Sequence, residues 1–214
     1  MSQHSEPWIE SSDVISMFPT LVWKLQPRPD LQRKIETNIL SLLETLRREQ
    51  PPFAPGQGWQ SESTLHQREE LHDLVVCING AAQSVLRFLK IGHGAIDITG
   101  CWATVLGKGA EHRIHSHPNN FLSGVYYVRT HHGADTINFH DPRSQASVIR
   151  PPVMALSAEN TDQAVVNVMN GTLLVFPSWL QHSVAPNLSD EERISISFNL
   201  MFAAFTENLA KPLW

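Results

Sequence analysis

The chain has 214 residues and a mass of 24.0 kDa, with 42% hydrophobic and 17% charged residues. This length and balance predict a single globular domain spanning residues 1–214. A formal net charge of −5, without a dense cluster of lysine and arginine, argues against a nucleic-acid binder. Because neither a signal sequence nor a run of about 18 apolar residues is visible, we expect a cytoplasmic protein with no membrane association.

The first elements predicted are a strand and a helix. Residues 18–26 carry β-branched and aromatic side chains after a proline, which suits an opening strand near a sheet edge. Apolar residues then recur at three- and four-residue steps over 31–46, the spacing of an amphipathic helix. Pro29-Asp30 offers its beginning, and Pro51 ends it.

A second helix is predicted over residues 71–89, where the same apolar spacing returns. Residues 64–67 have the spacing of a capping box ahead of it, and its end is expected near Gly92 or Gly94. We expect both helices to form a supporting segment, residues 30–92, that packs on one face of a sheet.

From residue 95 onward the pattern changes to short runs rich in Val, Ile, Thr, Tyr and Phe, separated by Gly, Pro, Asn and Asp. The predicted strands are 96–106, 123–129, 136–140, 171–176 and 193–202. Two helices followed by roughly eight short strands indicate a fold that is mainly β with flanking helices, a double-stranded β-helix or jelly roll. Its catalytic core is expected at about 95–203.

Histidines crowd the second half of the chain, where seven of the 11 lie between His112 and His182. Imidazole is the commonest protein ligand of first-row transition metals, and His115 and His117 share a face if they lie on one strand. The pair alone is weak evidence, since such spacings arise by chance. His182 is the candidate third ligand. His112 is close enough in sequence to be an alternative ligand, but its odd offset from His115 places it on the opposite face if the strand is regular.

Polar residues alternate with apolar ones along the last predicted strand, 193–202. The period of two places Arg193, Ser195, Ser197 and Asn199 on one face. A guanidinium can fork two hydrogen bonds onto a carboxylate and stays charged at any relevant pH. Taken by itself, this polar face is typical of a solvent-exposed strand. Because Arg193 follows His182 by only eleven residues, we instead expect the face to line a polar pocket.

Five motifs lie between residues 100 and 200: His115-x-His117-Pro-Asn, Leu-Ser-Gly-Val-Tyr-Tyr-Val, Asn138-Phe-His-Asp-Pro-Arg143, Phe176-Pro-Ser-Trp-Leu-x-His182-x-Val-x-Pro186 and Arg193-Ile-Ser-Ile-Ser-Phe-Asn199. Together they make this half of the chain resemble the Fe(II)/2-oxoglutarate-dependent oxygenases. More narrowly, it is similar to the small bacterial and phage group of 2-oxoglutarate oxygenases whose substrates are unassigned.

The resemblance implies an enzyme that binds Fe(II), 2-oxoglutarate and O2, and hydroxylates an unidentified substrate with release of succinate and CO2. It implies metal ligands at His115 and His182, with His117 in the place of the family's carboxylate. A third imidazole leaves such a site one negative charge short, which alters its redox potential and its affinity for an anionic cosubstrate. The alternative is that Asp135 or Asp141 supplies the carboxylate.

The resemblance also implies a cosubstrate site. Arg193 matches the residue that grips the far carboxylate of 2-oxoglutarate, and Tyr127 lies where related hydroxylases place a tyrosine that donates to it. Tyr126 then points into the packing. The predicted cofactor-binding residues are Arg193, Tyr127, Ser123, Ser195 and Asn199. The candidates for substrate contact or the cavity rim are Trp102, Asn119, His140, Asp141 and Arg143.

Two other functions stay open. The first is a three-His metal dioxygenase of the cupin kind that uses no 2-oxoglutarate, in which Arg193 contacts substrate or is structural. The second is a non-enzymatic jelly-roll module with a closed metal site, for which tetrahedral zinc is typical. The sequence names no primary substrate, and a homodimer is left open.

Overall fold

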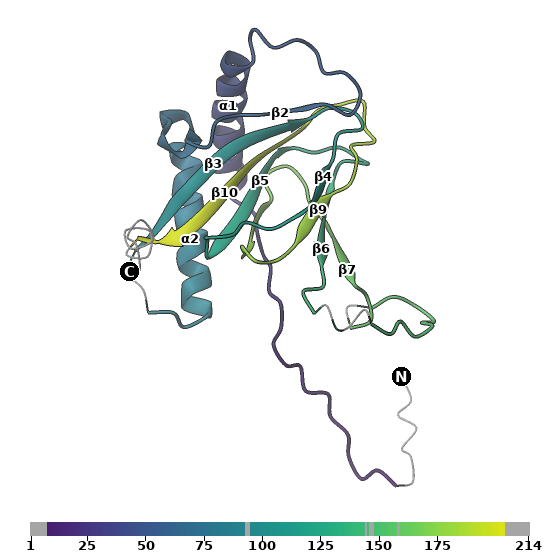
Figure 1. Ribbon diagram of the computed structural model, residues 1–214. Helices are drawn as coiled ribbons and strands as arrows, with labels where there is room; N and C mark the ends of the chain where they lie inside the picture. The colour runs from purple at the N-terminus through teal and green to yellow at the C-terminus, as the bar shows by residue number, and fades with distance from the viewer. Residues whose placement is uncertain (1–7, 93–94, 144, 146–147, 158, 204–214) are drawn as a thin grey trace, which may run out of the picture.

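The computed structural model describes residues 8–92, 95–143, 145, 148–157 and 159–203 (Figure 1). The N-terminal half contains β1 (Trp23–Leu25), α1 (Pro29–Leu46), β2 (Gly58–Gln60), the short 3-10 helices η1 (Leu65–Gln67) and η2 (Glu69–Leu71), and α2 (His72–Phe88). The second half contains β3 (Ile96–Leu106), β4 (His112–His115), β5 (Leu122–Arg129), β6 (Thr136–His140), β7 (Gln163–Asn167), β8 (Leu173–Pro177), β9 (His182–Val184) and β10 (Arg193–Phe202).

Both predicted helices are present, but the ends of α2 differ from the prediction. Thr64 precedes η1 and makes no side-chain capping bond, so the expected capping box belongs to a 3-10 turn and α2 begins only at His72. At the other end, Lys90 adopts the left-handed conformation with φ 55°. The Ile91 N–H then bonds the Leu86 carbonyl at 2.9 Å, which closes the helix before Gly92. Gly94 lies outside the described residues.

The strands form two antiparallel sheets. The six-stranded sheet has the order β1-β8-β5-β10-β3-β2, and the four-stranded sheet has the order β4-β9-β6-β7. Figure 1 shows α1 and α2 covering one face of the six-stranded sheet, with the smaller sheet on its other side. This is the predicted double-stranded β-helix. β2, β4, β7 and β9 were not predicted as strands, because runs of three to five residues show too little alternation.

Each face of the six-stranded sheet packs against a different layer, and β5 shows the division. Tyr126 is buried in the core between this sheet and the helices, while Tyr127 is buried in the core between the two sheets. β8 alternates in the same way, with Val175 on the helix side and Phe176 between the sheets. Alternate residues of the central strands therefore reach the space between the sheets.

In the described residues no helix is long and apolar enough to cross a membrane.

Candidate metal centre

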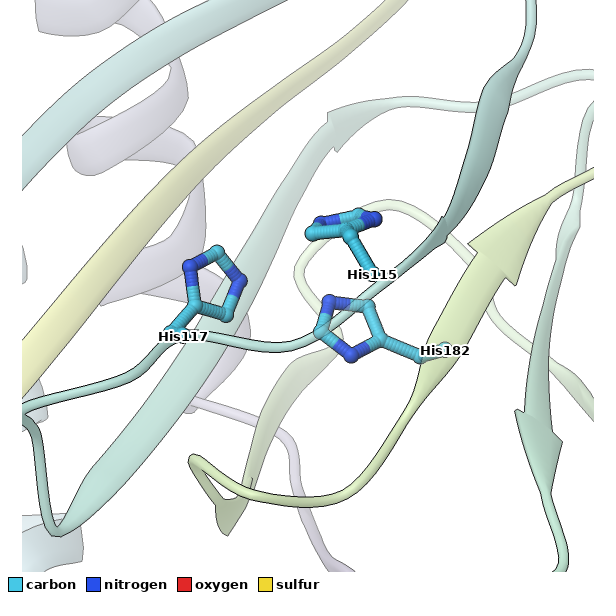
Figure 2. Close-up of side chains that lie close together, drawn as sticks. All are labelled: His115, His117 and His182. Carbon is cyan, nitrogen blue, oxygen red and sulfur yellow. The ribbon is translucent and has the colours of Figure 1, made fainter.

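Three histidines meet between the sheets, at the edge where β4 and β9 pair. His115 ends β4 and lies directly opposite His182, the first residue of β9. His117 follows in the loop after β4, where its backbone N–H bonds the Ser178 carbonyl at 2.9 Å. One ring nitrogen of each histidine lies within 4.8 Å of those of the other two. Figure 2 shows the three rings side by side, reaching from these separate segments.

Backbone carbonyls fix the orientation of two of the rings. Nδ1 of His115 lies 2.8 Å from the Arg113 carbonyl, and Nδ1 of His182 lies 2.9 Å from the Leu180 carbonyl. Because a carbonyl oxygen only accepts, each Nδ1 carries the hydrogen and each Nε2 keeps its lone pair. This is the outer hydrogen bond that metal-binding histidines generally make.

Burial favours the neutral form of two of the three rings. It lowers the pKa of His117 to about 4, with the charge of His115 as the smaller cause. Burial likewise lowers the pKa of His182 to about 4, against the hydrogen bond to Leu180 and with help from the neighbouring histidines. Neutral imidazoles offer lone pairs at neutral pH, so the donor set fits a divalent first-row transition metal.

The cluster contains no carboxylate from the described residues. Asp141 instead accepts two hydrogen bonds from the side chain of Arg143, at 2.8 and 2.9 Å. Asp135 lies outside the histidine cluster and nearer to Arg193: burial lowers the pKa of that guanidinium, and the charge of Asp135 is a smaller cause that opposes the shift. The structure thus brings together the three histidines and neither of the two aspartates considered as alternatives.

Arg193 lies in the same cavity as the histidines and carries a buried, unpaired charge. It is 3% exposed and forms no ion pair with any described residue. Its Nη2 donates to the Thr136 carbonyl at 3.1 Å, and its guanidinium carbon lies 5.2 Å from the ring centroid of Tyr127. Its Nε finds no partner in the described structure. A buried cation in this state calls for an anion.

Two hydroxyl groups beside Arg193 are also without partners. The hydroxyls of Tyr127 and Thr104 are buried and form no hydrogen bond to the described residues. Both residues pair across the sheet with Ser195, Tyr127 from β5 and Thr104 from β3, and all of them line the cavity with Arg193. Burial raises the pKa of Tyr127 to about 12, so its hydroxyl stays protonated. Together these groups offer donors to one carboxylate.

Thr104 was missed by sequence reasoning, since threonine in a strand carries no signal of its own. Gln60, its partner on β2, lines the same cavity and was missed for the same reason. Only the strand register brings the two residues beside Ser195 and Tyr127.

Ser123 and Asn199, predicted to bind the cosubstrate, do not line the cavity. The Ser123 hydroxyl donates to the Asn199 side chain at 2.7 Å and lies 3.0 Å from the Ser178 hydroxyl. These groups bond one another at the start of β5, whereas Ser195 and Ser197 do line the cavity.

The cavity has a volume of about 680 Å³, and its lining includes residues of both sheets, among them Gln60 of β2 and Arg113 of β4. Trp102 lines it, with its ring centroid 5.9 Å from that of His117. The other candidates for substrate contact or the rim are not among the lining residues: Asn119, His140, Asp141 and Arg143. His140 instead lies with its Nε2 2.9 Å from the Ser183 hydroxyl.

His112 contradicts the expectation that it points away from His115. It lines the cavity, and the two ring centroids are 6.1 Å apart. The pairing of β4 with β9 changes register between these two residues, so the strand is irregular where strict alternation was assumed. Burial lowers the pKa of His112, with the charges of His115 and Arg193 as further causes.

Residues 100–199 match the model of one protein family, described as "Putative 2OG-Fe(II) oxygenase". The matched segment contains all three clustered histidines and Arg193. No curated protein matches the chain.

Solved structures with the same fold include two prolyl hydroxylases. A prolyl-4-hydroxylase from Pseudomonas putida is 16% identical, with a TM-score of 0.58 over 85% of this chain and 92% of that one. A Trichoplax adhaerens prolyl hydroxylase, in complex with a hypoxia inducible factor peptide, is 13% identical, with a TM-score of 0.61 over 89% and 87%. HygX from Streptomyces hygroscopicus, with nickel and 2-oxoglutarate bound, is 11% identical, with a TM-score of 0.59 over 86% and 83%. At these identities the likeness shows the fold. Over residues 100–199, just under half of its length, the chain is similar to the 2OG-Fe(II) oxygenases, a family of enzymes.

Proposed function

We propose that the protein is an Fe(II)- and 2-oxoglutarate-dependent oxygenase that hydroxylates a primary substrate with release of succinate and CO2. The observation that carries this proposal is the buried, unpaired Arg193 in the cavity that also holds the three-histidine cluster. A metal and a dicarboxylate together would use both features.

His115, His117 and His182 are the proposed ligands, each through one ring nitrogen. When bound, Fe(II) and 2-oxoglutarate supply the oxidising chemistry, in which the cosubstrate becomes succinate. Three neutral imidazoles leave the full charge of the ion uncompensated, which strengthens its attraction for an anionic keto acid. His117 thus replaces a carboxylate without removing a donor.

Arg193 is proposed to hold the far carboxylate of 2-oxoglutarate, with Tyr127 and Thr104 donating their free hydroxyls and Ser195 between them. Bidentate charge-assisted hydrogen bonds in a buried site give both affinity and orientation. The apolar lining, which includes Val125 and Ile137, keeps water from this carboxylate.

Trp102 is proposed to contact the primary substrate, because its ring lies beside His117 on the cavity wall. Gln60 on β2 and Arg113 on β4 line the cavity from the two edge strands, so the substrate would reach the metal between them. Asn119, His140, Asp141 and Arg143 do not line the cavity, and a contact between them and the substrate stays a prediction.

The two rival functions differ in how they account for Arg193. A module with a closed metal site would bury its guanidinium with no anion to balance the charge. A cupin-type dioxygenase that uses no 2-oxoglutarate would need an anionic substrate there, and measuring 2-oxoglutarate consumption distinguishes that enzyme from the proposed one.

The test is uncoupled succinate formation by the Fe(II)-loaded protein with 2-oxoglutarate, O2 and no added substrate. We expect slow turnover in the wild-type protein, none in His182→Ala, and turnover only at much higher cosubstrate concentration in Arg193→Met. Wild-type protein that retains Fe(II) and makes no succinate would contradict the proposal.

A further inference from the structure

An ion pair lies directly behind the arginine proposed to bind 2-oxoglutarate. Arg47, the first residue after α1, donates two hydrogen bonds to the carboxylate of Glu192, which immediately precedes Arg193. Nη1 and Nη2 reach the two carboxylate oxygens at 2.8 and 2.7 Å. This forked geometry is the most directional one an arginine and a carboxylate can adopt.

Aromatic rings hold the Arg47 side of the pair. Its guanidinium carbon lies 4.9 Å from the ring centroid of Phe53 and 6.0 Å from that of Trp59. The Arg47 side chain is 19% exposed, compared with 38% for Glu192. The hydrogen bonds from Arg47 are the first cause that lowers the pKa of Glu192. Packing on two rings makes the pair more ordered than an isolated surface ion pair.

Few polar contacts fix the Arg193 side chain. It is the first residue of β10, and it pairs with Leu106 of β3. On the other side the pairing with β5 reaches only Ile194 and changes register there. The Arg193 side chain donates a hydrogen bond to the Thr136 carbonyl and packs against the ring of Tyr127. Successive residues of a strand point to opposite faces, so Glu192 reaches the helix layer while Arg193 enters the cavity.

We propose that Arg47 and Glu192 are positioning residues for the cosubstrate. They hold the start of β10 against the end of α1, and thereby place the Arg193 guanidinium where it receives the far carboxylate of 2-oxoglutarate. This inference rests on the proposed function. It means that contacts with the helix layer influence the affinity for 2-oxoglutarate through the position of Arg193.

The test compares Glu192→Gln and Arg47→Met with the control Asp73→Asn. The control breaks the 2.8 Å ion pair between Lys34 of α1 and Asp73 of α2, which joins the two helices and includes no residue of β10. We expect the dissociation constant and KM for 2-oxoglutarate to rise about tenfold in both test variants, with kcat at saturating cosubstrate within about twofold of the wild type. Amide hydrogen exchange at the start of β10 should also accelerate in these variants and stay unchanged in the control.

Arg47→Lys serves as a second variant in case Arg47→Met does not fold, because lysine keeps the charge and loses only the two parallel hydrogen bonds. We expect the dissociation constant for 2-oxoglutarate to rise less in Arg47→Lys than in Arg47→Met. If the folded variants bind 2-oxoglutarate like the wild type, or if the control weakens binding equally, the inference is overturned while the proposed function stands. Wild-type protein that does not bind 2-oxoglutarate overturns the proposed function and this inference with it.

Discussion

Replacing Arg193 by methionine should change stability and cosubstrate affinity in opposite directions. The guanidinium is 3% exposed and has no ion-pair partner among the described residues, so the ligand-free fold bears the desolvation of its charge. Exchanging buried charges for apolar side chains of similar volume is neutral or stabilises by about 1–4 kcal/mol. Leaving the Thr136 carbonyl without its donor costs about 1 kcal/mol. We therefore expect the free energy of unfolding to be unchanged or up to about 3 kcal/mol higher.

The affinity for 2-oxoglutarate should fall steeply in the same variant. Loss of a buried hydrogen-bonded charge pair costs about 2–5 kcal/mol. At about 1.4 kcal/mol per factor of ten, this is a rise of roughly 30- to 4000-fold in the dissociation constant. Urea denaturation of the metal-free protein and calorimetric titration of the Fe(II)-loaded protein measure the two quantities, with Arg87→Met on the exposed side of α2 as the control. A variant that is several kcal/mol less stable and binds 2-oxoglutarate normally would show that Arg193 is structural.

Three further outcomes are expected. His182→Ala should weaken Fe(II) binding by about a hundredfold or more, whereas His117→Asp, which restores the family's carboxylate, should retain the ion. Metal analysis after dialysis measures this, and loss of the ion from both variants would contradict it. The metal-free protein should lose stability as the pH falls from about 6.5 to about 4, because the unfolded chain then binds protons that buried His117 and His182 do not; denaturation midpoints that do not change over this range would refute it. Gly124→Ala should destabilise the protein by about 3 kcal/mol, since the added Cβ would lie 2.5 Å from the Leu174 carbonyl. Gly80→Ala in α2, where the added Cβ meets open space, should stabilise the protein by about 0.5–1 kcal/mol, and equal melting temperatures for the two variants would contradict both expectations.

Local patterns predicted the parts of the fold that depend on local spacing. The alternation in β10 placed Arg193 and Ser195 on the face that the structure turns toward the cavity, because a period of two holds along a regular strand. The apolar spacing of α1 likewise predicted its buried stripe, which includes Ile35 and Ile39. Both elements are long enough for their periods to be visible.

Features set by pairing between strands could not be predicted in this way. His112 enters the cavity through a register change between β4 and β9, and Thr104 reaches the site only as the neighbour of Ser195 across the sheet. Ser123 and Asn199 are the opposite case: both were predicted to bind the cosubstrate, but their side chains bond each other and do not line the cavity. Single-sequence patterns do not state which polar groups will meet.

The most direct test of the metal and cosubstrate site is the visible spectrum of the protein under anaerobic conditions, recorded with Fe(II) before and after 2-oxoglutarate is added. We predict that a new charge-transfer band appears in the wild-type protein, is absent in His182→Ala, and needs much more 2-oxoglutarate in Arg193→Met. Wild-type protein that binds Fe(II) and gives no new band at saturating 2-oxoglutarate would contradict the assignment of this cavity.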